Sequence, residues 1–203
     1  MLENTSENKI FISVYDGKFT VKTDQSNPKA KERINKNGTK VFELHFDSIS
    51  GFLENVQDFK TENANGTFRN IVFTLRDKEE VYSLATQYSS RESKGILMRL
   101  PNINLKNPIE IKIAKADHPF TWVTQNGVKV PLKWTKDQPG DLPQMKKIEV
   151  KGKDTYDDTE QMKFLFEYIQ ANVIAKIPSS SPDQGFSSPP LPSNPASEDD
   201  LPF

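Results

Sequence analysis

Short segments in which apolar and polar residues alternate recur from the start of this 203-residue chain to about residue 130. Alternation with a period of two is typical of β-strands that bury one face. Pairs that favour tight two-residue hairpins stand at Asp16-Gly17, Asn65-Gly66 and Asn126-Gly127. The pattern therefore predicts a largely β structure. The expected strands are 9–15, 18–23, 39–46, 51–61, 67–75, 80–85, 108–115 and 120–130.

Two segments have helical periodicity instead. Residues 90–100 predict a short helix with Ser90 as its N-cap, and residues 157–177 predict a longer helix capped by Asp157 or Asp158. The side chains expected to face inward from these helices are Ile96, Leu97, Leu100, Met162, Leu165, Phe166, Ile169 and Val173.

The order of the expected elements points to one fold class. Between residues 51 and 130 the order is strand, strand, strand, helix, strand, strand. This is the order of the OB-fold, a five-stranded Greek-key barrel that binds oligonucleotides and oligosaccharides. We therefore expect an all-β, OB-fold-like barrel with extra N-terminal strands, one short internal helix and a C-terminal helix. The strands before residue 48 are expected to be additions to the barrel.

The composition changes abruptly at Pro178. Residues 178–203 contain seven Pro and seven Ser and very few residues that could form a core. Such a segment cannot bury enough apolar surface to offset the entropy of ordering. We therefore expect one domain over residues 1–177, followed by a disordered, acidic, Pro/Ser-rich tail over residues 178–203.

Charge is divided unevenly at the same boundary. All 27 basic residues precede Pro178, together with 24 of the 28 acidic residues. The last 26 residues carry four acids and no base. A mildly basic body with an acidic end is typical of a protein that binds nucleic acid, or of one whose acidic tail masks its basic body.

Residue types needed for many catalytic and metal sites are scarce. The chain has no Cys and only two His, His45 and His118, which excludes disulfides, thiolate catalysis and cysteine zinc sites. It has no phosphate-binding Gly-rich loop, no G-x-S-x-G and no H-E-x-x-H. Helix capping explains the acidic residues between 154 and 160 without a bound cation. We expect neither an enzyme nor a cofactor or metal site.

No apolar run approaches the roughly 20 residues that span a bilayer, and residues 1–8 lack the basic and apolar regions of a signal peptide. We therefore expect a soluble protein of a reducing compartment, with no membrane association.

The last six residues, Glu198-Asp199-Asp200-Leu201-Pro202-Phe203, have a chemistry suited to protein docking. Phe203 offers a ring for an apolar pocket and a main-chain carboxylate for a basic rim, and Pro202 reduces the entropy lost on docking. The acidic side chains steer the tail toward basic surfaces. A merely solvating acidic end is the alternative interpretation.

This ending resembles the acidic tip of bacterial single-stranded DNA-binding proteins, in which acids are followed by Ile-Pro-Phe after a flexible linker. Leu201 stands where that family usually has Ile. In the family the Pro and Phe dock on DNA-processing enzymes, so the resemblance implies that Pro202 and Phe203 do so here.

The body is similar instead to single-stranded DNA-binding proteins of tailed bacteriophages, in segments 51–56, 127–131 and 142–148. This resemblance implies an OB-fold and partners in DNA replication, recombination and repair. It also implies a location in the cytoplasm of the infected bacterial host.

Binding of single strands without sequence preference needs cations for phosphates and exposed rings for base stacking. In residues 9–15, three apolar side chains alternate with Lys9, Phe11 and Tyr15, so this strand is either buried on both sides or displays two rings beside a lysine. A half-buried core position is the alternative for each ring. For the basic run 146–153, a solvated strand or loop is the alternative to a phosphate contact. The candidate DNA-binding residues are Trp134, Trp122, Tyr82, Tyr15, Phe11, Lys9, Arg69, Lys129, Lys133 and Lys136.

Two functional hypotheses follow, and an OB-fold that binds RNA or a duplex is a third possibility. In the first, the body coats single-stranded DNA and the tail recruits replication and recombination proteins. In the second, the chain is a protein-interaction adaptor of the replication machinery that uses the tail and does not bind DNA directly. The sequence leaves both a monomer and a homodimer open.

Overall fold

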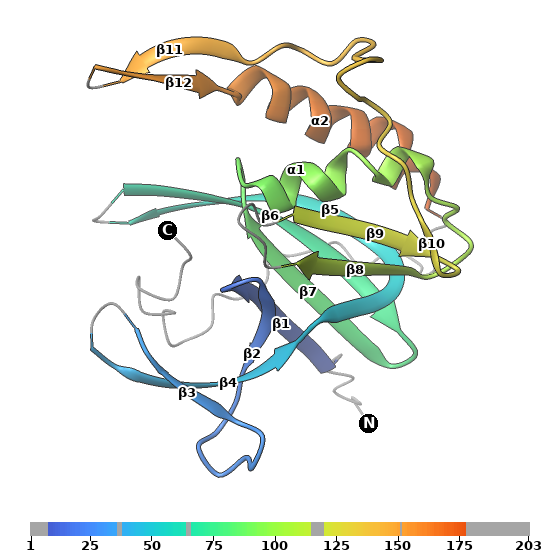
Figure 1. Cartoon of the computed structure of the whole chain (residues 1–203). Coiled ribbons are helices and arrows are strands. Elements are labelled where there is room, and N and C mark those ends of the chain that lie inside the picture. Colours follow the sequence, from blue (N-terminus) through green and yellow to red (C-terminus); the bar gives the residue numbers. More distant parts are fainter. Residues whose placement is uncertain (1–7, 36–37, 64–65, 115–119, 151, 178–203) are drawn as a thin grey trace, which may run out of the picture.

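The computed structural model describes residues 8–35, 38–63, 66–114, 120–150 and 152–177. Ten strands form one curled sheet in the order β10-β9-β8-β5-β6-β7-β1-β2-β4-β3, and β11 and β12 form a separate hairpin (Figure 1). The predicted all-β, OB-like class is confirmed. The strands of the large sheet are β1 (Asn8–Tyr15), β2 (Lys18–Lys22), β3 (Lys31–Ile34), β4 (Lys40–Phe46), β5 (Ser48–Asn63), β6 (Gly66–Asp77), β7 (Glu80–Gln87), β8 (Ile109–Ala114), β9 (Phe120–Gln125) and β10 (Val128–Lys129). The remaining elements are β11 (Lys146–Val150), β12 (Lys153–Asp157), α1 (Arg91–Leu97), α2 (Thr159–Asn172) and the 3-10 turns η1 (Leu100–Asn102) and η2 (Ile174–Lys176).

The strand pairings form a circuit. Only Asp47 separates β4 from β5, so these two strands act as one long, bent strand. β5 pairs with β6, β6 with β7, β7 with β1, β1 with β2, and β2 with β4. The β1–β7 pairing is parallel, whereas the other pairings of this circuit are antiparallel. The N-terminal strands are therefore extra to the predicted order, but β1 and β2 lie within the circuit.

The inner side of this sheet carries the core. Alternation along β6 places Ile71, Phe73 and Leu75 there, and all three are fully buried. The helices lie on one side of the sheet, as Figure 1 shows, and contribute Leu97 and Leu165 to the same core. Each such side chain stabilises the fold by roughly 1.5–3 kcal/mol relative to an exposed position. The apolar side chains predicted to face inward from the two helices are buried, except for the half-buried Phe166.

The hairpin turns form as predicted where they are described. Asp16 and Gly17 both have positive φ, at 48° and 71°, and so do Asn126 and Gly127, at 52° and 77°. Two successive positive φ values match the right-handed twist of the flanking strands. Of the third predicted turn, Asn65 lies outside the described residues.

The helix boundaries are close to those predicted. Ser90 caps α1 by accepting a hydrogen bond from the Ser93 amide at 3.1 Å. α2 begins at Thr159, where the Asp157 carboxylate accepts from both the amide and the hydroxyl of Thr159, at 2.9 and 2.6 Å. These bonds lower the pKa of Asp157. Neither helix in the described part of the chain is long and apolar enough to cross a bilayer.

Two strands, β3 and β12, were not predicted, and a third, β11, lies in the basic run 146–153, for which a solvated strand or loop was one of the two interpretations. β3 is a short edge strand of mainly charged residues, and β11 and β12 are exposed along nearly their whole length. None of them buries an apolar face, so none has the alternation from which the other strands were predicted.

Candidate nucleic-acid interface

The face of β1 opposite the core displays two aromatic rings beside cations. Ile12 points into the core, while Phe11 is 62% exposed and Tyr15 43% exposed. Lys9 Nζ lies 5.6 Å from the centroid of the Phe11 ring. The prediction for residues 9–15 is thereby resolved: the strand is buried on one side and displays both rings on the other.

The neighbouring strands add cations to this face. Directly paired residues of a sheet project to the same side, and the register pairs Tyr15 with Lys18, Lys22 with Glu43 and Lys31 with Glu43. We call this surface the Tyr15 face. It consists of Lys9, Phe11, Tyr15, Lys18, Lys22, Lys31 and Arg33.

A nearly buried ion pair supports the ring of Tyr15. The Arg33 guanidinium lies 4.6 Å from the Tyr15 ring centroid and donates two hydrogen bonds to Glu43, at 2.7 and 3.1 Å. Glu43 is only 3% exposed, and His45 Nε2 lies 3.7 Å from its second oxygen. Arg33 therefore neutralises Glu43 and holds one side of the Tyr15 ring.

The charge of the Tyr15 face is positive after these pairings. Its five cations are offset by Glu43, which pairs with Arg33, and by Asp47, which pairs with Lys18. The hydrogen bond from Lys18 lowers the pKa of Asp47, which keeps that carboxylate charged. The face thus carries more cations than the two carboxylates engaged in these pairs, which suits a polyanion.

A second aromatic surface lies on β8, β9 and β10, on the side that faces away from the core. Phe120 and Trp122 meet edge to face at a centroid distance of 4.9 Å, and Lys129 Nζ lies 4.5 Å from the Trp122 ring centroid. The register places Lys112 opposite Trp122 and Glu110 opposite Thr124. We call this surface the Trp122 face. It consists of Glu110, Lys112, Phe120, Trp122 and Lys129.

The prediction that Trp134 stacks on bases is corrected by its position. Its ring is 2% exposed and packs edge to face against Phe164 and Tyr168 of α2, at centroid distances of 5.8 and 5.0 Å. Its indole N–H donates to Asp141 at 2.9 Å. Trp134 thus fastens the segment after β10 to α2, and its ring offers no face to a ligand.

Lys133 and Lys136 lie in the same segment as Trp134, after β10, so the structure does not place them on either aromatic face. Lys133 Nζ lies 5.6 Å from the Trp134 ring centroid and 5.5 Å from that of Tyr168. Lys136 is exposed in the segment between β10 and β11.

Arg69 and Tyr82 project to the core side of the sheet. Arg69 forms hydrogen bonds with Asp58, which raise its pKa, and its guanidinium lies 3.7 Å from the Tyr88 ring centroid. Tyr82 is half-buried opposite Leu75 and donates to Glu80, a bond that raises its pKa to about 12. Both side chains are engaged within the protein. The structure therefore does not bring them to the Tyr15 face.

Sequence reasoning missed seven residues of the two faces: Lys18, Lys22, Lys31, Arg33, Glu110, Lys112 and Phe120. Lys18 and Lys22 could have been found, because they alternate with apolar residues in a strand that was predicted. Arg33 and Lys31 could not, because β3 has no apolar pattern.

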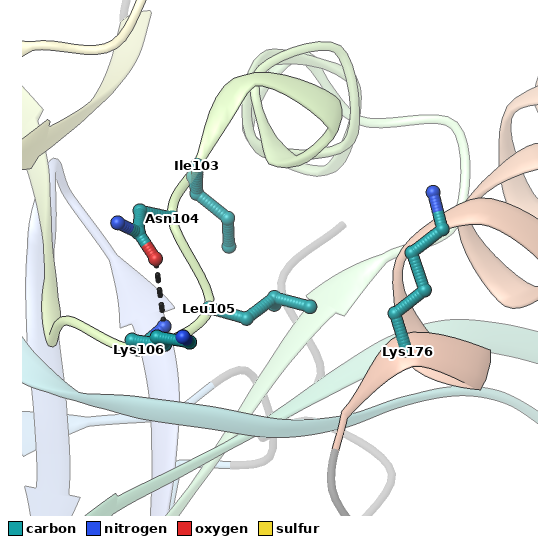
Figure 2. A pocket seen from close by; sticks show the side chains of 5 residues that line it. All are labelled: Ile103, Asn104, Leu105, Lys106 and Lys176. Atoms are coloured by element: carbon teal, nitrogen blue, oxygen red, sulfur yellow. Dashed lines mark hydrogen bonds between the residues drawn. The ribbon is translucent and has the colours of Figure 1, made fainter.

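A pocket of about 550 Å³ lies between the segment after η1 and the 3-10 turn η2, as Figure 2 shows. None of the predicted site residues lines it; its lining residues are Ile103, Asn104, Leu105, Lys106 and Lys176. Among the described residues, no group of three or more His, Asp or Glu is placed to hold a metal ion. The predicted docking tail, Glu198 to Phe203, lies outside the described residues.

Comparison of the chain with protein-family models, with curated proteins and with solved structures found no match.

Proposed function

We propose that the protein binds single-stranded DNA without sequence preference and that the Tyr15 face is its contact surface. The observation that carries the proposal is the coincidence on one face of two exposed rings, Phe11 and Tyr15, with five cations. Rings stack on any base, and cations neutralise phosphates, so the combination binds the strand rather than a particular sequence.

A single strand suits this face better than a duplex. Phe11 and Tyr15 lie on the same side of one strand, four residues apart with Ser13 between them, so the two rings can accept separate unstacked bases. In a duplex the base faces are already stacked on one another. Cations alone would then have to provide the binding, and the rings would contribute little.

The tail has a separate role in this proposal. By its resemblance to bacterial single-stranded DNA-binding proteins, Pro202 and Phe203 recruit proteins of replication, recombination and repair. By the resemblance of the body to phage proteins, the site of action is the cytoplasm of an infected bacterium. Because the tail carries four acids, its carboxylates also compete with DNA for the cations of the body.

One observation favours the alternative of an adaptor that does not bind DNA. The β11–β12 hairpin exposes apolar side chains, including Ile148, Val150 and Tyr156, which a protein partner could cover. An adaptor has no need, however, for the rings and cations of the Tyr15 face, so a DNA titration distinguishes the two functions.

The test is a titration of labelled oligo(dT) followed by fluorescence anisotropy at several salt concentrations. If three to five phosphates are neutralised, log K should fall with log[salt] at a slope of about −2 to −4. Phe11→Ala should weaken binding by roughly 5- to 150-fold, because stacking contributes about 1–3 kcal/mol per base.

Phe46→Ala is the matched control. Phe46 is 43% exposed, like Tyr15, but projects from the opposite side of the same sheet, across from Phe19. Its removal should leave affinity unchanged. Absence of oligo(dT) binding at low salt would overturn the proposal. Equal losses for Phe11→Ala and Phe46→Ala would show that the Tyr15 face is not the contact surface.

A further inference from the structure

We propose that the Trp122 face is a second base-stacking site for the same DNA strand, so that a bound strand runs from the Tyr15 face across the junction of β4 and β5 to β9. This inference rests on the proposed function and adds to it a second contact and a path.

The rings of the Trp122 face form a unit suited to a flat aromatic ligand. Phe120 is 43% exposed, and its edge-to-face contact with Trp122 fixes the orientation of both rings. Because Thr121 and Val123 are buried on the other side of β9, the rings cannot turn into the core. Indole has the largest π-face of the side chains, which makes it a strong platform for a base.

The charges on this face fit a phosphate beside that base. Lys112 and the Thr124 hydroxyl both interact with one oxygen of Glu110, each at 2.9 Å. The bond from Lys112 lowers the pKa of Glu110, so the two groups form a neutral pair. Lys129 is placed directly over the Trp122 ring and leaves the face with one net positive charge. A base on the rings therefore has a cation within reach of its phosphate.

The two faces adjoin at a defined point. Lys18 of the Tyr15 face pairs with Asp47, and the next residue, Ser48, is the register partner of Lys112 on the Trp122 face. β2 also contacts β8 directly. A strand leaving Tyr15 therefore meets Lys18 and then Lys112 before it reaches Trp122. The path therefore places two lysines, each paired with a carboxylate, between the rings of the two faces, where the phosphates that link the stacked bases would lie.

Tryptophan fluorescence tests the second site directly. The chain has two Trp, and Trp134 is buried, so quenching by oligo(dT) should report on Trp122. We expect quenching in the intact protein and in Trp134→Phe, and its loss in Trp122→Phe. The pair of variants keeps the test decisive even if Trp134→Phe fails to fold.

The affinity for oligo(dT) as a function of the length of the oligonucleotide provides the second measurement. Anisotropy is recorded with oligo(dT) of about 5 and about 16 nucleotides, which bracket the site sizes of OB-folds. The longer oligonucleotide should bind more tightly than the shorter one. Trp122→Ala and Phe120→Ala should each reduce this gain in affinity by roughly 5- to 150-fold. Phe46→Ala, whose ring is equally exposed elsewhere, should preserve that gain to within about 2-fold.

The outcomes separate the two proposals. If oligo(dT) binds and depends on Phe11, but neither quenches Trp122 nor responds to Trp122→Ala, the second site is refuted and the proposed function stands. If the intact protein shows no binding by anisotropy, the proposed function fails and the second site fails with it. If the Trp122 face instead binds a protein partner, oligo(dT) should bind without quenching Trp122 and without responding to Trp122→Ala.

Discussion

The Arg33–Glu43 pair offers a quantitative test of the structure that needs no ligand. Arg33→Met removes the guanidinium that donates both hydrogen bonds to a carboxylate with 3% exposure. His45 Nε2, at 3.7 Å, is too distant to replace them. Breaking a buried pair typically costs about 3–5 kcal/mol, and because Arg33 reaches the surface we expect about 3 kcal/mol here. That loss corresponds to a melting temperature lower by roughly 6–12 °C.

Urea denaturation, monitored by circular dichroism, measures the free energy of unfolding that Arg33→Met loses. Two further variants show whether that loss comes from the buried charge. Lys40→Met breaks the exposed Lys40–Glu32 pair on the same hairpin and should cost at most about 1 kcal/mol. The double variant Arg33→Met/Glu43→Gln removes the buried charge as well and should recover about 2 kcal/mol. A loss below about 1 kcal/mol for Arg33→Met, or a double variant equal to the sum of the single ones, would refute a buried pair at this position.

Two other predictions concern the sheet itself. Gly51→Ala should lower the free energy of unfolding by about 1–3 kcal/mol, because the new Cβ would lie 2.8 Å from the backbone oxygen of Arg76; thermal denaturation equal to that of the parent protein would contradict that close approach. Tyr82 should ionise near its pKa of about 12, and Tyr82→Phe should remove that step from an ultraviolet absorbance titration. Because the pKa is raised above its ordinary value of 10, the stability contributed by the Glu80 bond is present below pH 10 and lost as the pH rises to 12.

Strands with a buried face were the predictable part of the fold. The alternation around Ile12 and Phe73 specified both their strands and their inward direction, since the period of a strand is fixed at two. Asp16-Gly17 and Asn126-Gly127 specified tight turns for an equally local reason. The parallel pairing of β1 with β7 had no such signal, because it joins segments distant in the chain and depends on how the whole sheet closes.

The candidate site was predictable only in part, for the same reason. Phe11 and Tyr15 followed from local alternation, and their exposure agrees with it. Trp134 was misjudged, because its environment is supplied by α2, about 30 residues further along the chain. Arg33 reaches the Tyr15 ring from an edge strand that the pattern did not reveal. Residues positioned by distant elements are therefore the ones for which local pattern fails.

The parallel pairing of β1 with β7 also determines when the Tyr15 face can exist during synthesis. Ile12 is paired with Leu84, which leaves the ribosome 72 residues later, a delay of roughly 4–14 s. The meander of β5, β6 and β7 has mostly local contacts and can form first. The strand that carries Phe11 and Tyr15 is thus synthesised well before its partner β7, although its C-terminal end can already pair with β2. The end of β1 that carries Phe11 is paired with the meander only once the third strand of the meander has been synthesised.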